Sequence, residues 1–152
     1  LLQLLKTSVL VKERIVKEDP HEQGIRRALN LGHTVGHAFE SKALHDGKPI
    51  AHGYAVAWGM VAEMVLSHQI LKFPTEDLHR LADFVYANYG AYHITCDHYD
   101  ELLHLMHHDK KSEHGEINCT LLAACGDVRP GHTITDDQMR IALDLYRDLL
   151  HI

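Results

Sequence analysis

The sequence predicts a mostly α-helical domain with one small β-hairpin, and three observations support this prediction. Apolar residues recur at helical spacing in roughly six separate segments that cover most of the 152-residue chain. A single stretch, residues 115–131, is instead rich in β-forming residues and is bounded by glycines. With 45% hydrophobic residues and no repeat or linker, residues 1–152 are expected to form one domain with a sizeable core.

Loop signals separate the first three helical segments. Residues 1–17 carry apolar side chains at helical spacing, and Glu-Asp-Pro at positions 18–20 ends that pattern. Residues 24–43 continue with helical periodicity, and residues 44–53 form a loop because they contain Asp-Gly and a proline. Residues 54–71 are almost wholly apolar, which is typical of a buried helix.

The second half of the chain carries clearer helix-end signals. Thr75 is the predicted N-cap of a helix that ends near Gly90, a residue typical of a helix C-cap. A further helix is expected over residues 97–108. After the hairpin, Thr135 and Gln138 have the spacing of a capping box, which predicts the start of the last helix.

The charge and the apolar runs argue against two classes of partner. The formal net charge is -6, and lysines and arginines are interspersed among the acidic residues, so there is no basic stripe for a nucleic acid. The longest apolar run meets Glu63 well before the roughly 20 residues that a bilayer-spanning helix needs. Neither nucleic-acid binding nor membrane insertion is therefore expected.

The cysteines and the first residues indicate the setting of the protein. Cys96, Cys119 and Cys125 lack C-x-x-C spacing, which argues against a disulfide framework and a thiolate zinc site and favours a cytoplasmic location. The chain begins inside an amphipathic pattern, without an initiator methionine or the layout of a signal peptide. We therefore expect a fragment of a longer cytoplasmic protein.

The stretch "LNLGHTVGHAFE", residues 29–40, places His33 and His37 one helical turn apart, each directly after a glycine. Glycine lowers helix stability by about 1 kcal/mol relative to alanine, so Gly32 and Gly36 indicate close approach by another backbone or by a ligand. A glycine-mediated helix crossing with incidental histidines is one interpretation. A ligand site is the other.

The chemistry of the imidazoles favours a metal. Neutral histidine is the commonest nitrogen ligand of divalent metals, and a catalytic zinc ion takes three protein ligands and keeps one open position. Spacing alone allows His33 and His37 to chelate together, with Glu40 or His52 as the third ligand.

Cationic and amide side chains near these histidines suit a small polyhydroxylated anion. Lys12, Arg26 and Asn30 precede them, and the sequence Asp-Lys-Lys at positions 109–111 follows later. Taken singly, each of these cations is more often simple surface charge.

Together these motifs resemble a known family. "EQGIRRALNLGHTVGHAFE", "HGYAVAWGM" and "HDKK" are similar to the C-terminal domain of 3-dehydroquinate synthase over about residues 12–111. The resemblance implies conversion of 3-deoxy-D-arabino-heptulosonate 7-phosphate, a phosphorylated sugar acid, to 3-dehydroquinate and phosphate in the shikimate pathway. It also implies a zinc or cobalt ion, NAD and a homodimer. The expected fold is the helical C-terminal half, whose partner, an N-terminal NAD-binding domain, is absent from this chain.

The resemblance also implies roles for individual residues. His33 and His52 match the metal-ligating histidines of the family, whose third ligand is a glutamate that precedes this segment. His37 matches a histidine that assists proton transfer, which replaces the chelate suggested by spacing. Substrate-binding positions of the family are matched by Lys12, Arg26, Asn30 and one of Lys110 and Lys111.

One departure leaves other functions open. Tyr54 stands where the family commonly has a glutamate, directly after a ligand region, so substrate preference could differ. Related sugar-phosphate cyclases and metal-dependent polyol dehydrogenases are therefore alternatives. A non-catalytic metal-binding and association module is a third possibility, because the chain has no G-x-G-x-x-G motif after a strand.

Overall fold

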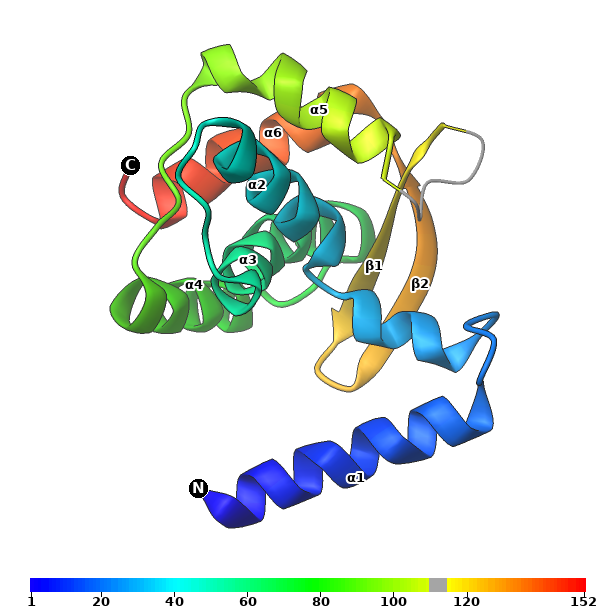
Figure 1. The fold of residues 1–152 in the computed structure, drawn as a ribbon. Coiled ribbons are helices and arrows are strands. Elements are labelled where there is room, and N and C mark those ends of the chain that lie inside the picture. Colours follow the sequence, from blue (N-terminus) through cyan, green and yellow to red (C-terminus); the bar gives the residue numbers. More distant parts are fainter. Residues whose placement is uncertain (110–114) are drawn as a thin grey trace.

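The computed structural model describes residues 1–109 and 115–152, and it confirms a mostly helical fold with one β-hairpin (Figure 1). The elements in chain order are α1 (Leu2–Glu18), the 3-10 helix η1 (Ile25–Asn30), α2 (His33–His45), α3 (His52–Leu71), α4 (Thr75–Tyr89), the 3-10 helix η2 (Cys96–His98), α5 (Tyr99–His107), β1 (Ile117–Ala124), β2 (Asp127–Ile134) and α6 (Asp136–Leu149).

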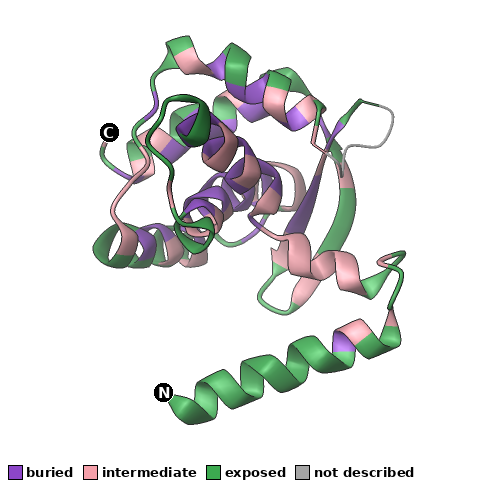
Figure 2. Ribbon diagram, viewed as in Figure 1, coloured by how far each residue is buried: buried purple, intermediate pink, exposed green. Residues whose placement is uncertain are grey.

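Helix α3 is the centre of the core. The helices α2, α4 and α6 and the strand β1 all pack against it. Its residues are buried almost continuously from Trp58 to Ser67 (Figure 2). A helix surrounded in this way must be apolar on all sides, which explains the nearly unbroken apolar run of its sequence.

The helix predicted over residues 24–43 is interrupted, and that prediction was wrong in this respect. Residues 25–30 form η1, and α2 begins only at His33. Gly32 lies between them with φ of +79°, a left-handed conformation that breaks an α-helix and that glycine adopts without strain. Its N–H donates a hydrogen bond to the side chain of Glu63 on α3 instead of to a carbonyl one turn back.

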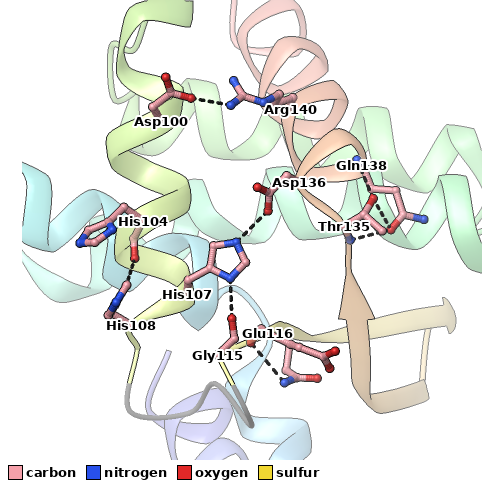
Figure 3. Close-up of polar contacts among 11 residues, drawn as sticks. Asp100, His104, His107, His108, Gly115, Glu116, Thr135, Asp136, Gln138 and Arg140 are labelled. Atoms are coloured by element: carbon pink, nitrogen blue, oxygen red, sulfur yellow. Dashed lines mark hydrogen bonds and ion pairs between the residues drawn. The ribbon is translucent and has the colours of Figure 1, made fainter.

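The loop predicted over residues 44–53 is shorter than expected, because α2 continues to His45 and α3 already begins at His52. The capping signals agree with the structure except at one position. Pro74, not Thr75, is the N-cap of α4, and its extended backbone leads directly into the first turn. Gly90 has φ of +66° and ends α4 as predicted. Thr135 and Gln138 form the predicted capping box at the start of α6 (Figure 3).

The remaining elements flank the core. The hairpin pairs β1 and β2 in antiparallel register from Ile117 opposite Ile134 to Ala124 opposite Asp127, slightly beyond the predicted stretch. The helix expected over residues 97–108 begins as η2 and continues as α5.

The first helix lies apart from this body. Helix α1 packs on η1 and is exposed along almost its whole length (Figures 1 and 2). Its apolar residues, including Leu2, Leu5 and Val9, face solvent in this chain. Within the described residues, no helix combines the length and the apolar character needed to cross a bilayer.

Candidate metal centre

Three glycines let α2 and α3 cross at backbone contact. A Cβ atom on Gly36 would lie 2.9 Å from the carbonyl oxygen of Ala55, and one on Gly59 would lie 2.6 Å from the backbone nitrogen of Gly36. A Cβ atom on Gly32 would collide with the side chain of Met60. The glycines therefore serve a helix crossing, which was the first of the two interpretations from sequence. Because Gly36 meets the first turn of α3, the crossing also brings the beginnings of the two helices together.

This crossing places three histidines around one point. His33 is the first residue of α2, His52 is the first residue of α3, and His37 lies one turn along α2. The centroids of their rings are 5.4 Å apart for His33 and His37, 5.4 Å for His33 and His52, and 5.8 Å for His37 and His52. These are the three histidines that the sequence motifs singled out, and the structure brings them together.

The three imidazoles fit a divalent cation. One ring nitrogen from each lies within 4.8 Å of the others. Around a tetrahedral zinc ion, with Zn–N bonds of about 2.1 Å, ligand nitrogens are about 3.4 Å apart, so small rotations of the side chains would close the site. His52 is exposed and the other two are partly buried, which leaves one side of the cluster accessible to a small molecule.

In all three rings, Nδ1 forms a hydrogen bond with an oxygen acceptor. The acceptors are Leu31 O for His33 at 3.1 Å, Asp109 Oδ2 for His37 at 3.0 Å, and Glu40 Oε2 for His52 at 3.0 Å. Carbonyl and carboxylate oxygens only accept, so the neutral rings carry their hydrogen on Nδ1 and a lone pair on Nε2. Metal-ligating histidines usually have such oxygen partners behind them.

The contacts of Glu40 and His52, the two candidates for a third ligand from sequence spacing, differ. Glu40 lies behind His52 and accepts its hydrogen bond, whereas His52 itself lies with the other two imidazoles. Glu40 therefore orients a candidate ligand.

Two acidic residues of the site, Asp109 and Glu63, were not recognised from the sequence as part of it. Asp109 was noted only as the neighbour of two lysines, yet its carboxylate, with 13% of the side chain exposed, holds His37. Glu63 was noted only as the end of an apolar run. A carboxylate inside a buried helix is itself a signal, because such a group needs hydrogen-bond partners.

Glu63 is fully buried and accepts backbone hydrogen bonds from α2. Oε2 accepts from the N–H of Gly32 at 2.6 Å and Oε1 from the N–H of Val35 at 3.1 Å. Burial raises the pKa of Glu63 to about 8, and the hydrogen bonds from these backbone groups oppose that rise.

The predicted substrate-binding residues that the structure describes lie on η1 and α1, not on the helices that carry the three histidines. Arg26 and Asn30 lie on η1, directly before α2, where Arg26 Nη1 donates to Pro20 O at 2.8 Å and Asn30 Nδ2 donates to Glu22 Oε1 at 2.6 Å. Lys12 is exposed on α1 and makes no ion pair with any residue that the structure describes. Lys110 and Lys111 lie outside the described residues.

Tyr54 lies in an aromatic group near the beginning of α3. Its ring packs edge-on against Trp58 and Tyr89, with centroids 5.7 Å and 5.2 Å away. About half of the side chain remains exposed, at 45%.

Comparison with known proteins identifies the family. The family described as "3-dehydroquinate synthase C-terminal" matches residues 1–112. The chain belongs to the 3-dehydroquinate synthase family. This assignment confirms the resemblance seen in the motifs.

Several relatives bear this name. A 3-dehydroquinate synthase of Parabacteroides distasonis is 51% identical over 95% of this chain and 41% of its own length. The 3-dehydroquinate synthase of Methylacidiphilum infernorum is 41% identical over 83% of this chain and 35% of its own length. The chain thus spans about two fifths of the length of such 3-dehydroquinate synthases.

A solved structure of another synthase has the same fold. ValA, a 2-epi-5-epi-valiolone synthase from Streptomyces hygroscopicus with NAD+ and Zn2+ bound, superposes with a TM-score of 0.79 at 23% identity. The match covers 97% of this chain and 40% of ValA.

Proposed function

We propose that residues 1–152 are the helical metal- and substrate-binding domain of a 3-dehydroquinate synthase. The full-length enzyme would convert 3-deoxy-D-arabino-heptulosonate 7-phosphate to 3-dehydroquinate and phosphate. The observation that carries this proposal is the cluster of His33, His37 and His52, each held at Nδ1 by an oxygen acceptor, in a chain of this family.

We propose further that an NAD-binding domain precedes this one in the full-length protein. The match to a C-terminal family description and the coverage of only 41% of a relative's length support this arrangement. Following the family resemblance, the complete protein would be a cytoplasmic homodimer.

The proposed ligands of a zinc or cobalt ion are His33 and His52, with a third ligand from the preceding part of the full-length protein. Their Nδ1–H groups are already engaged, so Nε2 is the nitrogen that would face the ion. Such an ion supplies Lewis acidity toward a substrate hydroxyl, while NAD carries the redox chemistry.

His37 is the proposed proton-transfer residue. Asp109 accepts its Nδ1–H at 3.0 Å, which fixes the tautomer and leaves Nε2 as the nitrogen that would exchange a proton with the substrate. Because its ring lies 5.4 Å from that of His33, a molecule held at the ligands would be next to it. The assignment of His33 and His52 as ligands and of His37 as the proton-transfer residue follows the family resemblance, since all three rings have an oxygen acceptor at Nδ1.

The anionic groups of the substrate would be bound by the cationic and amide residues that match substrate-binding positions of the family. Arg26 and Asn30 are candidates because η1 leads directly into the start of α2. Lys12 and one of Lys110 and Lys111 complete the proposed set.

Separate substitutions in the full-length enzyme test these roles. His33→Ala and His52→Ala are expected to lose bound metal and activity together, because each removes a ligand. His37→Ala is expected to keep its metal and to lower the rate by about 10²-fold or more, with a changed pH dependence. Metal analysis and single-turnover kinetics measure both effects. If His37→Ala loses metal as readily as His33→Ala, the three histidines form a simple chelate and the proposed role of His37 is wrong.

A related sugar-phosphate cyclase is the second candidate function. The exposed Tyr54, two residues after His52, favours it because a tyrosine replaces the carboxylate common at this position. Phosphate release from the heptulosonate phosphate, compared with release from other sugar phosphates, distinguishes the two enzymes.

A further inference from the structure

The beginning of α2 is capped by a side chain from another helix. The first N–H groups of an α-helix have no partners within the helix and need acceptors from elsewhere. The N-cap of α2 is Gly32, which has no side chain to offer. The side chain of Glu63 on α3 serves in place of an N-cap side chain. It accepts hydrogen bonds from the N–H groups of Gly32 at 2.6 Å and Val35 at 3.1 Å.

These two hydrogen bonds lie on either side of a proposed metal ligand. His33 follows Gly32 directly and precedes Val35 by two residues, so its backbone is fixed between two anchored N–H groups. The anchor is on α3, the helix whose first residue is His52. One carboxylate therefore ties the backbone of one proposed ligand to the helix that carries the other.

Core packing does not account for an acidic residue at this position. Glu63 is 0% exposed and lies in a stretch of α3 where its neighbours are apolar. A carboxylate is much harder to bury than an aliphatic side chain of similar size, and a well-packed apolar residue often gives equal or greater stability. What an aliphatic side chain cannot do is accept the two N–H groups at the start of α2.

We propose that Glu63 is a positioning residue of the metal centre, which fixes the start of α2 and thereby the placement of His33 relative to His52. This inference rests on the proposed function, because it takes these two histidines as ligands. Glu63 is not among the residues whose ligand atoms gather in the cluster, and it acts through the backbone of Gly32 and Val35.

Glu63→Gln in the full-length protein tests the proposal, with Co2+ as the probe. The amide keeps the size of the side chain, but its NH2 group cannot accept a hydrogen bond from an N–H donor. We expect Co2+ affinity to fall by about tenfold or more, as for other residues that orient ligands, and the visible Co2+ absorption spectrum to change.

Ser67→Ala is the matched control. Ser67 lies one turn further along α3, is also 0% exposed, and accepts a hydrogen bond from Leu122 N of the hairpin at 3.0 Å. It also donates one to the backbone carbonyl of Glu63 at 2.8 Å, a group that does not take part in capping α2. Its loss should lower the melting temperature without changing Co2+ affinity or the spectrum. Wild-type affinity and spectrum in Glu63→Gln, or equal changes in Ser67→Ala, would overturn the proposal.

Two further measurements keep the test decisive. If Glu63→Gln does not fold, amide hydrogen exchange of the wild type in mild denaturant is measured with and without Co2+. Co2+ should then slow exchange at residues 61–66 as well as at residues 32–36. Slowing confined to residues 32–36 would contradict the proposal. His33→Ala separates this failure from failure of the proposed function, since unchanged Co2+ binding in that variant would refute the metal centre itself.

Discussion

Lys42 is a buried lysine whose ammonium group joins two helices. Its Nζ lies 2.9 Å from Asp46 Oδ2 and 3.0 Å from Glu101 Oε2 on α5, and only 6% of its side chain is exposed. Burial disfavours the charged form, but the hydrogen bonds that the ammonium donates to the two carboxylates outweigh burial and raise the pKa of Lys42 above its usual value. The ion pairs therefore keep α5, which leads to Asp109, against α2.

We predict that Lys42→Met lowers the free energy of unfolding by roughly 1–2 kcal/mol, less than for a fully buried pair because both carboxylates can be rehydrated. Urea unfolding of the chain measures this change. Lys48→Met is the control, since Lys48 is exposed and should change stability by less than about 0.5 kcal/mol. Equal stability of the two variants would show that the Lys42 ion pairs contribute nothing.

The crossing of α2 and α3 leaves no space for an added side-chain atom at its glycines. We predict that Gly59→Ala destabilises the chain by about 1–3 kcal/mol or more, because a Cβ there would lie 2.6 Å from Gly36 N and the two backbones would have to separate. Gly53→Ala, on the same helix, is the control. Nothing lies within 4 Å of a Cβ at Gly53, so this change should be neutral or slightly stabilising. Thermal unfolding of both variants checks the difference, and equal melting temperatures would contradict the close crossing.

His107 joins the end of α5, the start of the hairpin and the start of α6 (Figure 3). Its Nδ1 lies 2.6 Å from Gly115 O and its Nε2 lies 2.7 Å from Asp136 Oδ1, so both nitrogens face acceptors and the imidazolium satisfies both. The hydrogen bond to Gly115 O and then that to Asp136 raise the pKa of His107.

This raised pKa gives stability a defined pH dependence. A histidine whose pKa is higher in the folded state stabilises the fold fully below its unfolded pKa, near 6.5, and this contribution is lost as the pH rises through the folded pKa. We predict that the stability difference between wild type and His107→Gln shrinks from pH 6 to pH 8.5 in urea unfolding. His104→Gln, on the same helix, should leave the pH dependence as in the wild type. A constant difference for His107→Gln would contradict the prediction.

Local signals were enough to predict most elements, but not the break before α2. The 3.6-residue periodicity and the capping residues Gly90 and Thr135 act within a few positions of themselves, so they can be read directly from the sequence. The break at Gly32 depends on Glu63, 31 residues away, and on the fit of α3. The glycines were recognised as a point of close approach, and only packing could show that the neighbour is a helix.

The candidate site likewise has residues that could be found from the sequence and contacts that depend on the tertiary structure. His33, His37 and His52 were found because the motif places all of them in one short region. Asp109 lies 72 residues from His37, and its contact depends on how α5 packs across α2. The orientation of each imidazole is therefore a property of the tertiary structure, although its presence is a property of the motif.

The chain holds only part of the proposed enzyme. We predict that purified residues 1–152, with added NAD and zinc, release no detectable phosphate from the heptulosonate phosphate, because the third ligand and the nucleotide site are proposed to lie elsewhere. Zinc should also bind weakly, since two histidines make a poorer site than three protein ligands.

A phosphate assay and zinc titration of the isolated chain check this prediction. The full-length enzyme, assayed under the same conditions, is the positive control. Measurable turnover would contradict the proposed division of the site. Tight, stoichiometric zinc would show that another ligand of the chain, His37 or Glu40, completes the coordination.

The position of the three histidines along the chain also bears on how the site forms during folding. They come from two successive helices, α2 and α3, joined by a loop of only a few residues, so closing this pair costs little chain entropy. Contacts between sequence neighbours form faster than distant ones, and Asp109 must arrive with α5, much later in the chain. We therefore expect the imidazole cluster to assemble early on the folding pathway, before the partner that orients His37.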